Sequence, residues 1–221
     1  MWAPILLSLR IAFIATFFSA IFGILFAFII NKPNIPGKNI WETLSTLPMI
    51  LPPSVTGYYL LLLLGKRGAV GRFFIDIFGY KIIFTWVAAV IAAAVVSLPL
   101  MYQNVKAAFV STNPIYENAA RTLGSGTFKV FRTITIPLAL PGIISGIVLA
   151  FCRAIGEFGA TLMVAGNIPR KTQTVPTAIY YAVQNGKDEE ANLLVLLMTG
   201  FSFLLIFSLN QWMKKKNYTG T

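Results

Sequence analysis

Residues 113–137 read NPIYENAARTLGSGTFKVFRTITIP and form a polar interruption between two strongly apolar stretches. The part from Tyr116 to Leu123 is rich in helix formers, whereas Gly124-Ser125-Gly126 is typical of a helix end. Thr127 has a side chain that can cap a second short helix leading to Pro137. The stretch therefore predicts two short helices joined by a glycine turn, lying outside a membrane. We call residues 113–137 the handle.

Composition indicates the fold class. Of the 221 residues, 57% are hydrophobic and 11% are charged, whereas soluble domains have about 25% charged residues. Several apolar runs reach the roughly 18–20 residues that a helix needs to cross a bilayer. We expect an all-α integral membrane protein, a polytopic helical bundle that forms one transmembrane domain over residues 1–221. Its five predicted transmembrane helices lie at about 4–30, 43–64, 82–101, 134–152 and 192–213.

The apolar run 158–168 is too short to span a membrane alone. It follows Gly156-Glu157-Phe158-Gly159, where two glycines can interrupt a helix. We therefore expect it to continue the fourth span after a break near these residues. A re-entrant segment is the alternative.

Charge gives a weak preference for one orientation. With the handle and the C-terminal lysines on one side, nine lysines and arginines lie there (Lys32, Lys38, Lys106, Arg121, Lys129, Arg132, Lys214, Lys215, Lys216). Seven lie on the other side (Lys66, Arg67, Arg72, Lys81, Arg170, Lys171, Lys187). Under the positive-inside rule the first side is the cytoplasm. An odd number of spans then places the N-terminus outside and the C-terminus in the cytoplasm.

The net charge of +11 has two interpretations. The basic residues lie at segment ends and no basic run is interleaved with exposed aromatic residues, which favours anionic lipid head groups over nucleic acid. The basic residues in 66–81 and 170–187 can also attract anions or an acidic partner to the outer face. The alternative is that they are interfacial residues with no steering role.

Several kinds of chemistry are excluded or disfavoured. The chain has no histidine, and Cys152 is its single cysteine, so neither a cysteine-cluster metal site nor an intrachain disulfide is expected. The phosphate-binding pattern Gly-x-x-x-x-Gly-Lys-Ser/Thr is absent, so this chain does not hydrolyse ATP by that machinery. Its seven acidic residues form no pair at catalytic spacing deep in the membrane. We expect no catalytic residue, no metal and no cofactor.

A second informative string is LPMILPPSVTGYYLLLLLGKRGAVG at residues 47–71. Its prolines bend a helix and free backbone carbonyls, which are tolerated at membrane depth only beside protein or a watery cavity. This segment, which also contains Gly57, is therefore expected to line a path, where Ser54, Thr56 and Tyr58 offer hydroxyls to an oxyanion. The alternative is a kinked packing helix whose hydroxyls bond its own backbone.

The third string is RAIGEFGAT at residues 153–161. Arg153 and Glu157 lie four residues apart on one helix face, so they can pair. Charged residues at membrane depth are costly, which makes a functional site the default hypothesis. Three roles stay open: a structural ion pair, part of a gate or subunit seam, and direct substrate contact by Arg153.

The handle resembles the "EAA" loop of the permeases of ATP-binding-cassette importers. That pattern is Glu-Ala-Ala, three residues, Gly, nine residues, Ile, one residue and Leu-Pro. Aligning Gly124, Ile134 and Pro137 places Asn118-Ala119-Ala120 on the triplet, with a carboxylate one position earlier at Glu117 and Ile136 in place of Leu. An ordinary cytoplasmic loop with a glycine turn is the alternative.

The remaining strings narrow the resemblance to the permeases for molybdate, with those for sulfate and thiosulfate next. The matching motifs are PGK at 36–38, LPPSVTGY, GKRGAVG, AARTLG, LPGI at 140–143, IGEFGAT and NIPRKTQTVPTAIY at 167–180. The resemblance implies a homodimer that forms the translocation path in the plasma membrane of a prokaryote. It also implies a cytoplasmic ATPase dimer and an external binding protein that delivers molybdate or tungstate.

The resemblance assigns roles to two sets of residues. The coupling loop at about 113–133 would dock on the ATPase through Glu117, Asn118, Ala119, Ala120, Arg121 and Gly124. The path or gate would involve Ser54, Thr56, Gly57, Arg153 and Glu157. A secondary anion carrier or channel is the alternative from another class, although carriers tend to show internal repeats and none is found here. A membrane enzyme is a weaker alternative.

Overall fold

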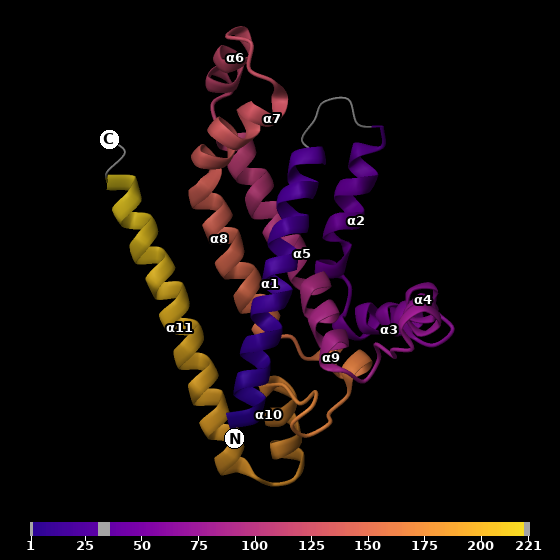
Figure 1. The fold of residues 1–221 in the computed structure, drawn as a ribbon. Coiled ribbons are helices and arrows are strands. Elements are labelled where there is room, and N and C mark those ends of the chain that lie inside the picture. The colour runs from indigo at the N-terminus through magenta and orange to yellow at the C-terminus, as the bar shows by residue number, and fades with distance from the viewer. Residues whose placement is uncertain (1, 31–35, 219–221) are drawn as a thin grey trace.

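The computed structural model describes residues 2–30 and 36–218, with side chains described up to residue 214. Lys32, Lys215 and Lys216, which enter the charge comparison above, therefore fall outside the described side chains. Regular structure in the described ranges is helical (Figure 1). The helices are α1 (Trp2–Ile30), α2 (Lys38–Ile50), α3 (Pro53–Leu64), α4 (Ala69–Phe78), α5 (Trp86–Ser111), α6 (Pro114–Thr122), α7 (Thr127–Val130), a π-helical segment (Phe131–Thr135), α8 (Ile136–Ile155), α9 (Gly159–Ala165), α10 (Val175–Gln184) and α11 (Asp188–Tyr218).

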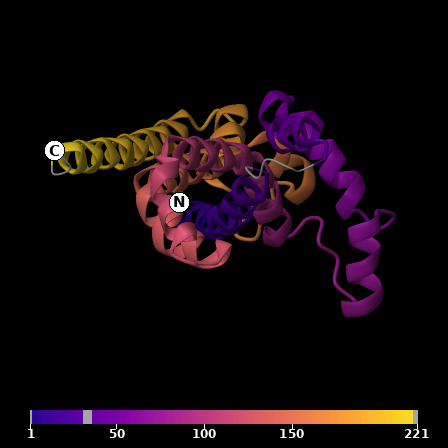
Figure 2. The ribbon, with the colours of Figure 1, turned by 90° about the horizontal axis from the view of Figure 1, so that it is seen from above.

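Helices α1, α5 and α8 form the centre of the molecule, and small residues let them approach closely. Ala12 and Ala15 of α1 and Ala92 of α5 are fully buried. A Cβ on Gly142 of α8 would lie 2.5 Å from the Cβ of Ala108 on α5, so this crossing depends on the missing side chain. Seen from above, α11 and the α2–α4 segment extend from this centre toward opposite sides (Figure 2).

Four helical stretches among the described residues are long and apolar enough to cross a membrane. Trp2–Ile30, Trp86–Ser111, Thr127–Ile155 and Asp188–Lys214 correspond to four of the five predicted spans. The protein is therefore a multi-pass helical membrane protein, as predicted. The fourth span is longer than expected because the second part of the handle continues into α8 through the π-helical segment.

The predicted span over 43–64, whose prolines were expected to bend a helix, is a pair of helices joined at a sharp bend. The chain breaks here, and the directions of Lys38–Ile50 (α2) and of Pro53–Phe78 (α3 and α4) differ by 113°. Leu51 is extended (φ −66°, ψ 141°) and precedes Pro52 and Pro53. A residue before proline avoids the helical region, and neither proline supplies an N–H to continue the ladder. Counted as one bent span, this pair brings the number of apolar spans among the described residues to five.

The predicted break after the fourth span is present. Helix α8 ends at Ile155, Gly156 follows it, and α9 begins at Gly159. One detail of the handle differs from expectation: Gly126, rather than Thr127, is the cap residue of α7, and no side chain caps it. Thr127 is the first helical residue instead.

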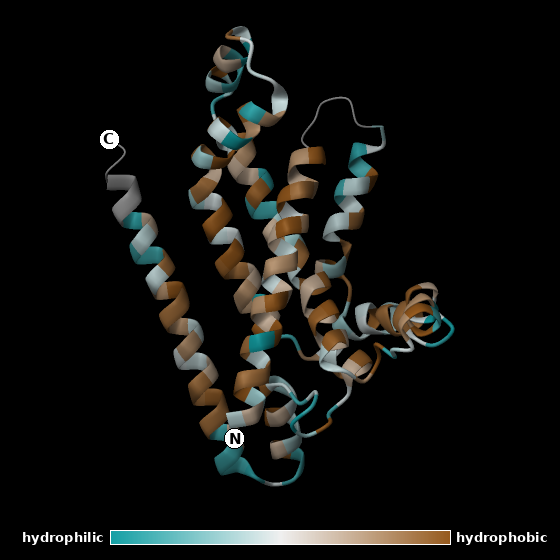
Figure 3. Cartoon of the chain, in the orientation of Figure 1, coloured by the Kyte–Doolittle hydropathy of each residue, from teal (hydrophilic) through white to brown (hydrophobic). Residues whose placement is uncertain are grey.

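The two ends of the molecule differ in polarity from its middle. The handle and the last turns of α11 lie at one end, while the start of α1 and α10 lie at the other (Figure 1). Hydrophilic residues gather in the handle and in the turn between α10 and α11, and hydrophobic residues dominate the helices between them (Figure 3). This separation is expected for a chain with water at both ends and lipid between.

Candidate functional site: the handle and the contact between α3 and α9

The first helix of the handle is well determined by its own sequence. The side chain of Asn113 accepts a hydrogen bond of 3.0 Å from the backbone N–H of Ile115, and Pro114 occupies the first turn. Both are favoured at a helix start. Glu117 lies in the first turn of α6 and Arg121 in its last turn. At these positions each charge interacts favourably with the helix dipole.

The turn of the handle depends on one glycine. Gly124 has φ +81°, the left-handed conformation that follows many helices. The N–H of Gly124 bonds to the carbonyl of Arg121 at 2.9 Å, and that of Ser125 to Ala120 at 3.0 Å. A Cβ at Gly124 would meet nothing within 4 Å, so the constraint comes from backbone conformation and not from space.

The handle exposes large apolar side chains among its polar residues. Leu123 is 86% exposed and Phe128 is 72% exposed. Asn118, Ala119 and Arg121 are exposed or partly exposed as well. Large exposed apolar side chains rimmed by polar ones mark a protein interaction site. The six residues predicted to couple are thus gathered on one protrusion.

The second and third informative strings meet at a contact between α3 and α9. A Cβ on Gly57 would lie 2.8 Å from the Cβ of Met163 and 2.9 Å from the Cα of Ala160. A Cβ on Gly159 would lie 2.7 Å from the Cβ of Pro53. Each helix therefore presents a glycine to the other. Sequence reasoning assigned Gly57 to the path, whereas the structure places it at this close contact.

Arg153 and Glu157 form the ion pair that their spacing predicts. Nη1 of Arg153 lies 2.7 Å from Oε2 of Glu157, and the Glu157 side chain is 2% exposed. Oε1 of Glu157 accepts a hydrogen bond of 2.8 Å from the N–H of Ala160 in the first turn of α9. The carboxylate thus joins the end of α8 to the start of α9, beside the contact with α3.

The predicted hydroxyls of the second string face different surroundings. Ser54 and Tyr58 are exposed, whereas Thr56 is buried and its Oγ1 has no hydrogen-bond partner among the described atoms. The structure therefore does not bring Ser54 and Thr56 together on one surface. A buried hydroxyl without a hydrogen-bond partner lowers stability, so the environment of Thr56 is more unusual than that of Ser54.

One long-range ion pair was missed by sequence reasoning. Nζ of Lys106 on α5 lies 2.8 Å from Oε1 of Glu42 on α2, with both side chains about one-third to one-quarter exposed (33% and 26%). Nε2 of Gln103 also lies 3.9 Å from Sδ of Met49. These contacts hold α2 against α5. No local spacing relates residues on different helices, so sequence pattern could not reveal them.

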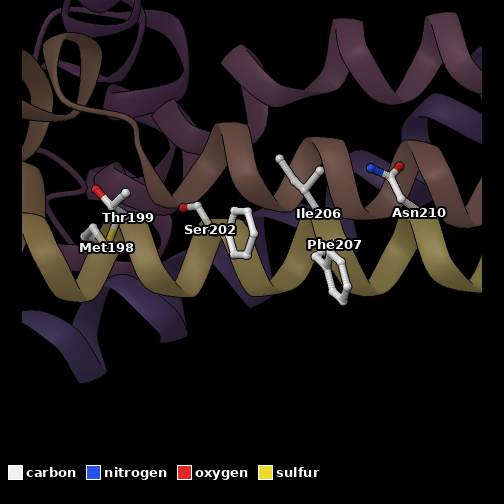
Figure 4. A pocket seen from close by; sticks show the side chains of 7 residues that line it. Met198, Thr199, Ser202, Ile206, Phe207 and Asn210 are labelled. Atoms are coloured by element: carbon white, nitrogen blue, oxygen red, sulfur yellow. The ribbon is translucent and has the colours of Figure 1, made fainter.

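A hollow of about 530 Å³ runs along α11 and involves none of the predicted path residues. Figure 4 shows its side chains along one face of this helix. They are Met198, Thr199, Ser202, Phe203, Ile206, Phe207 and Asn210. Helix α11 begins close to the start of α1 and moves away from α1 toward its own C-terminal end (Figure 1), and Phe203 and Phe207 are 67% and 50% exposed. Its mostly apolar lining suits a lipid chain or another helix better than an anion.

Curated proteins provide relatives across nearly the whole chain. The chain is 42% identical over 214 residues to the molybdenum transport system permease protein ModB of Escherichia coli K12, covering 97% of this chain and 93% of that protein. It is 34% identical over 203 residues to the sulfate transport system permease protein CysT of Salmonella typhimurium, covering 92% and 73%.

Solved structures share the fold at low sequence identity. The inward-facing MetNI methionine ABC transporter matches with a TM-score of 0.74 and 17% identity, covering 97% of this chain and 96% of that chain. A bacterial alginate ABC transporter in complex with its oligosaccharide-bound periplasmic protein matches with a TM-score of 0.74 and 18% identity, covering 96% and 78%. The fold is therefore that of an ABC importer permease.

The model of one protein family matches residues 19–216, which include α2 to α10, the handle and parts of α1 and α11. The match contains every residue that the sequence analysis assigned to coupling or to the path. The chain belongs to the family of inner membrane components of binding-protein-dependent transport systems.

Proposed function

We propose that this chain is the permease subunit of an ATP-binding-cassette importer for molybdate. The observation that carries the proposal is the 42% identity, over nearly the full length of both chains, to a permease named for molybdenum transport. The permease named for sulfate transport is less similar, at 34% identity, and makes sulfate the second candidate. The first proposal includes tungstate as a substrate, because tungstate has the same charge and shape as molybdate.

The proposed assembly has several partners. Two copies of this chain form the translocation path in the plasma membrane, and each docks its handle on a separate cytoplasmic ATPase subunit. An oxyanion-binding protein delivers the substrate to the opposite face. The exposed apolar and basic side chains of the handle support the docking part of this proposal. The shared fold with importer permeases, one of them in complex with a periplasmic protein, supports the rest.

The proposed mechanism is alternating access. Closure of the ATPase dimer on ATP moves the two handles together and opens the outer mouth, and hydrolysis reverses the movement. The contact between α3 and α9 adjoins both the bend at Leu51–Pro53 and the end of α8. A shift of α8 would thus reach α3 through α9, which makes this contact the candidate gate.

A secondary carrier that works without an ATPase is the alternative from another class. Membership of a binding-protein-dependent family speaks against it. The two differ in one requirement: a carrier transports in the absence of ATP, whereas the proposed importer needs its ATPase and ATP for each cycle.

The test is ATPase activity and uptake in vesicles that contain this chain and its ATPase. The binding protein is added empty, loaded with molybdate or loaded with sulfate. Stimulation by the molybdate-loaded form alone supports the proposal, while stimulation by the sulfate-loaded form alone supports the second candidate. Uptake without ATPase contradicts both. A Gly124→Val variant should keep basal hydrolysis and lose stimulation, because a β-branched residue is strained at φ +81°.

A further inference from the structure

The carboxylate of Glu117 connects the handle to the fourth span. Its Oε1 accepts a hydrogen bond of 2.6 Å from the hydroxyl of Thr135, and its Oε2 lies 3.4 Å from Nη2 of Arg121. Arg121 lies on α6, the helix that carries Glu117. Of the two contacts, the bond with Thr135 is therefore the one that joins α6 to a different element.

Thr135 belongs to a segment that packs against the central helices. It is 7% exposed and ends the π-helical segment, in which the N–H of Ile136 bonds to the carbonyl of Phe131. The ring of Phe131 packs 4.0 Å from that of Phe28 on α1 and 5.9 Å from that of Phe109 on α5, measured between centroids. This segment is thus anchored to both central helices.

Helix α6 has no such anchor of its own. None of its nine described residues is buried. The chain connects α6 to α5 through Thr112 and Asn113 and to α7 through the turn around Gly124, and the Glu117–Thr135 bond is the side-chain contact that ties it to the start of α8. A turn with a left-handed glycine is easily deformed, whereas a short hydrogen bond to an ionised carboxylate is among the stronger directional contacts in proteins.

The π-helical segment is a second reason why the Glu117–Thr135 hydrogen bond can influence α8. Such segments interrupt the regular ladder, occur mostly as single turns and are frequent at functional sites. A π turn holds one residue more than an α turn, so it can gain or lose that residue and rotate the adjoining helix by about 100°. The hydroxyl of Thr135 lies at the end of this segment, where α8 begins.

We propose that Thr135 is a positioning residue for coupling, because its bond to Glu117 passes the displacement of α6 to the start of α8. The inference rests on the proposed function, in which the handle follows the ATPase. Thr135 touches neither substrate nor ATPase in this role. It determines how much of the movement of the handle reaches the span that leads to α9.

The test uses the complete transporter with three substitutions. Thr135→Val keeps the shape and removes the hydroxyl, Thr135→Ser restores the hydroxyl, and Thr133→Val is the matched control. The hydroxyl of Thr133 lies on an exposed side chain two residues earlier and donates 2.7 Å to the carbonyl of Lys129 four residues before it. Basal ATPase activity and uptake per ATP are measured for each variant.

The expected result is a loss of coupling without a loss of assembly. Thr135→Val should keep the ATPase subunit bound and lower uptake per ATP about tenfold, the effect of one hydrogen bond to a charged group. Thr135→Ser should recover most of the uptake, and Thr133→Val should match the parent. In a Glu117→Ala background, Thr135→Val should have no further effect, since the bond is already absent.

Hydrogen exchange of the purified chain gives a readout that does not require transport. In Thr135→Val the amides of α6 should exchange faster, while those of α8 at 139–151 should not. If Thr135→Val leaves uptake per ATP and α6 exchange unchanged while the parent transports, the inference is wrong. If α8 exchanges faster together with α6, Thr135 has a structural role only and the inference is also wrong. If the parent shows no ATP-dependent uptake, the proposed function fails instead.

Discussion

Gly57 is required by the close approach of two helices, and this requirement can be tested with a single methyl group. A Cβ at this residue would lie 2.8 Å from the Cβ of Met163 and 2.9 Å from the backbone of Ala160. Gly57→Ala should lower the free energy of unfolding by about 1–3 kcal/mol, the usual cost of overpacking. Thermal unfolding in detergent measures this change.

The matched control for Gly57 is Gly200 on α11. A Cβ there would meet nothing within 4 Å. Gly200→Ala should stabilise the chain by about 0.5–1 kcal/mol because alanine favours a helix. The two substitutions are chemically identical and are expected to act in opposite directions. Equal effects would contradict the close contact between α3 and α9.

Glu157 has two partners, and two substitutions can separate them. Glu157→Gln removes the ion pair with Arg153 but keeps an oxygen that accepts from the N–H of Ala160. Glu157→Ala removes both contacts and leaves a cavity. The alanine variant should be destabilised by about 2 kcal/mol, since it loses two hydrogen bonds to a charged group while Arg153 can reach water, and the glutamine variant by clearly less.

Chemical or thermal unfolding of both Glu157 variants in detergent provides the measurement, with uptake as a second readout. Arg153 is one-third exposed (33%), so it can reach water when it loses its partner. If glutamine and alanine are equally destabilising, the ion pair with Arg153 carries the effect and the cap on α9 contributes little.

At the scale of the elements, α2 is a short helix held to the bundle by few polar contacts. Glu42 pairs with Lys106 on α5, whereas the prolines after Ile50 leave α2 without a helical continuation. Glu42→Gln should weaken this attachment by about 1 kcal/mol, or about fivefold in the population of an open form. The amides of α2 should then exchange hydrogen faster.

Asp76→Asn is the control for the substitution in α2. Asp76 pairs with Arg72 four residues earlier on α4, and both side chains are mostly exposed (62% and 76%). A pair of this kind contributes almost nothing, so exchange in α2 and α4 should not change. Faster exchange of α2 in both variants would indicate a general loss of charge balance and not a specific attachment.

The helices also show which features of the structure could be predicted from the sequence. Apolar runs predicted four spans because length and composition are local properties. Over 43–64 they predicted a span but not the size of its bend, because Pro52 and Pro53 alter direction without altering apolarity. The Arg153–Glu157 pair was predictable from helical spacing. Contacts such as Gly57–Ala160 and Glu117–Thr135 depend on how distant segments pack, which no local pattern records.

At the scale of the whole molecule, the structure has a central bundle with two extensions. Helix α11 extends to one side and the α2–α4 segment to the other (Figure 2). Ile40 and Ile50 of α2 are 65% and 77% exposed. A second copy of the chain or lipid can cover such apolar surface in a membrane. The proposed homodimer is consistent with this shape and stays a prediction.

The orientation of the molecule in the membrane is the last prediction, and it decides whether the handle can meet a cytoplasmic ATPase. The handle and the turn between α10 and α11 lie at opposite ends (Figure 1). Cys152 is the single cysteine, so a Cys152→Ser background accepts one new cysteine at a time. Thr122→Cys reports on the handle and Lys187→Cys on the opposite turn; both residues are exposed.

In spheroplasts that lack the ATPase subunit, a membrane-impermeant maleimide should label Lys187→Cys and spare Thr122→Cys. Permeabilisation should then expose Thr122→Cys, and both should react in detergent, which controls for intrinsic reactivity. The expected pattern follows from the resemblance of the handle to a loop that docks on a cytoplasmic ATPase and from the odd number of predicted spans. The nine-to-seven distribution of basic residues adds a small preference under the positive-inside rule. The reverse pattern would place the handle outside the cell, where no ATPase could drive it, and would contradict the coupling role of Glu117, Arg121 and Thr135 together.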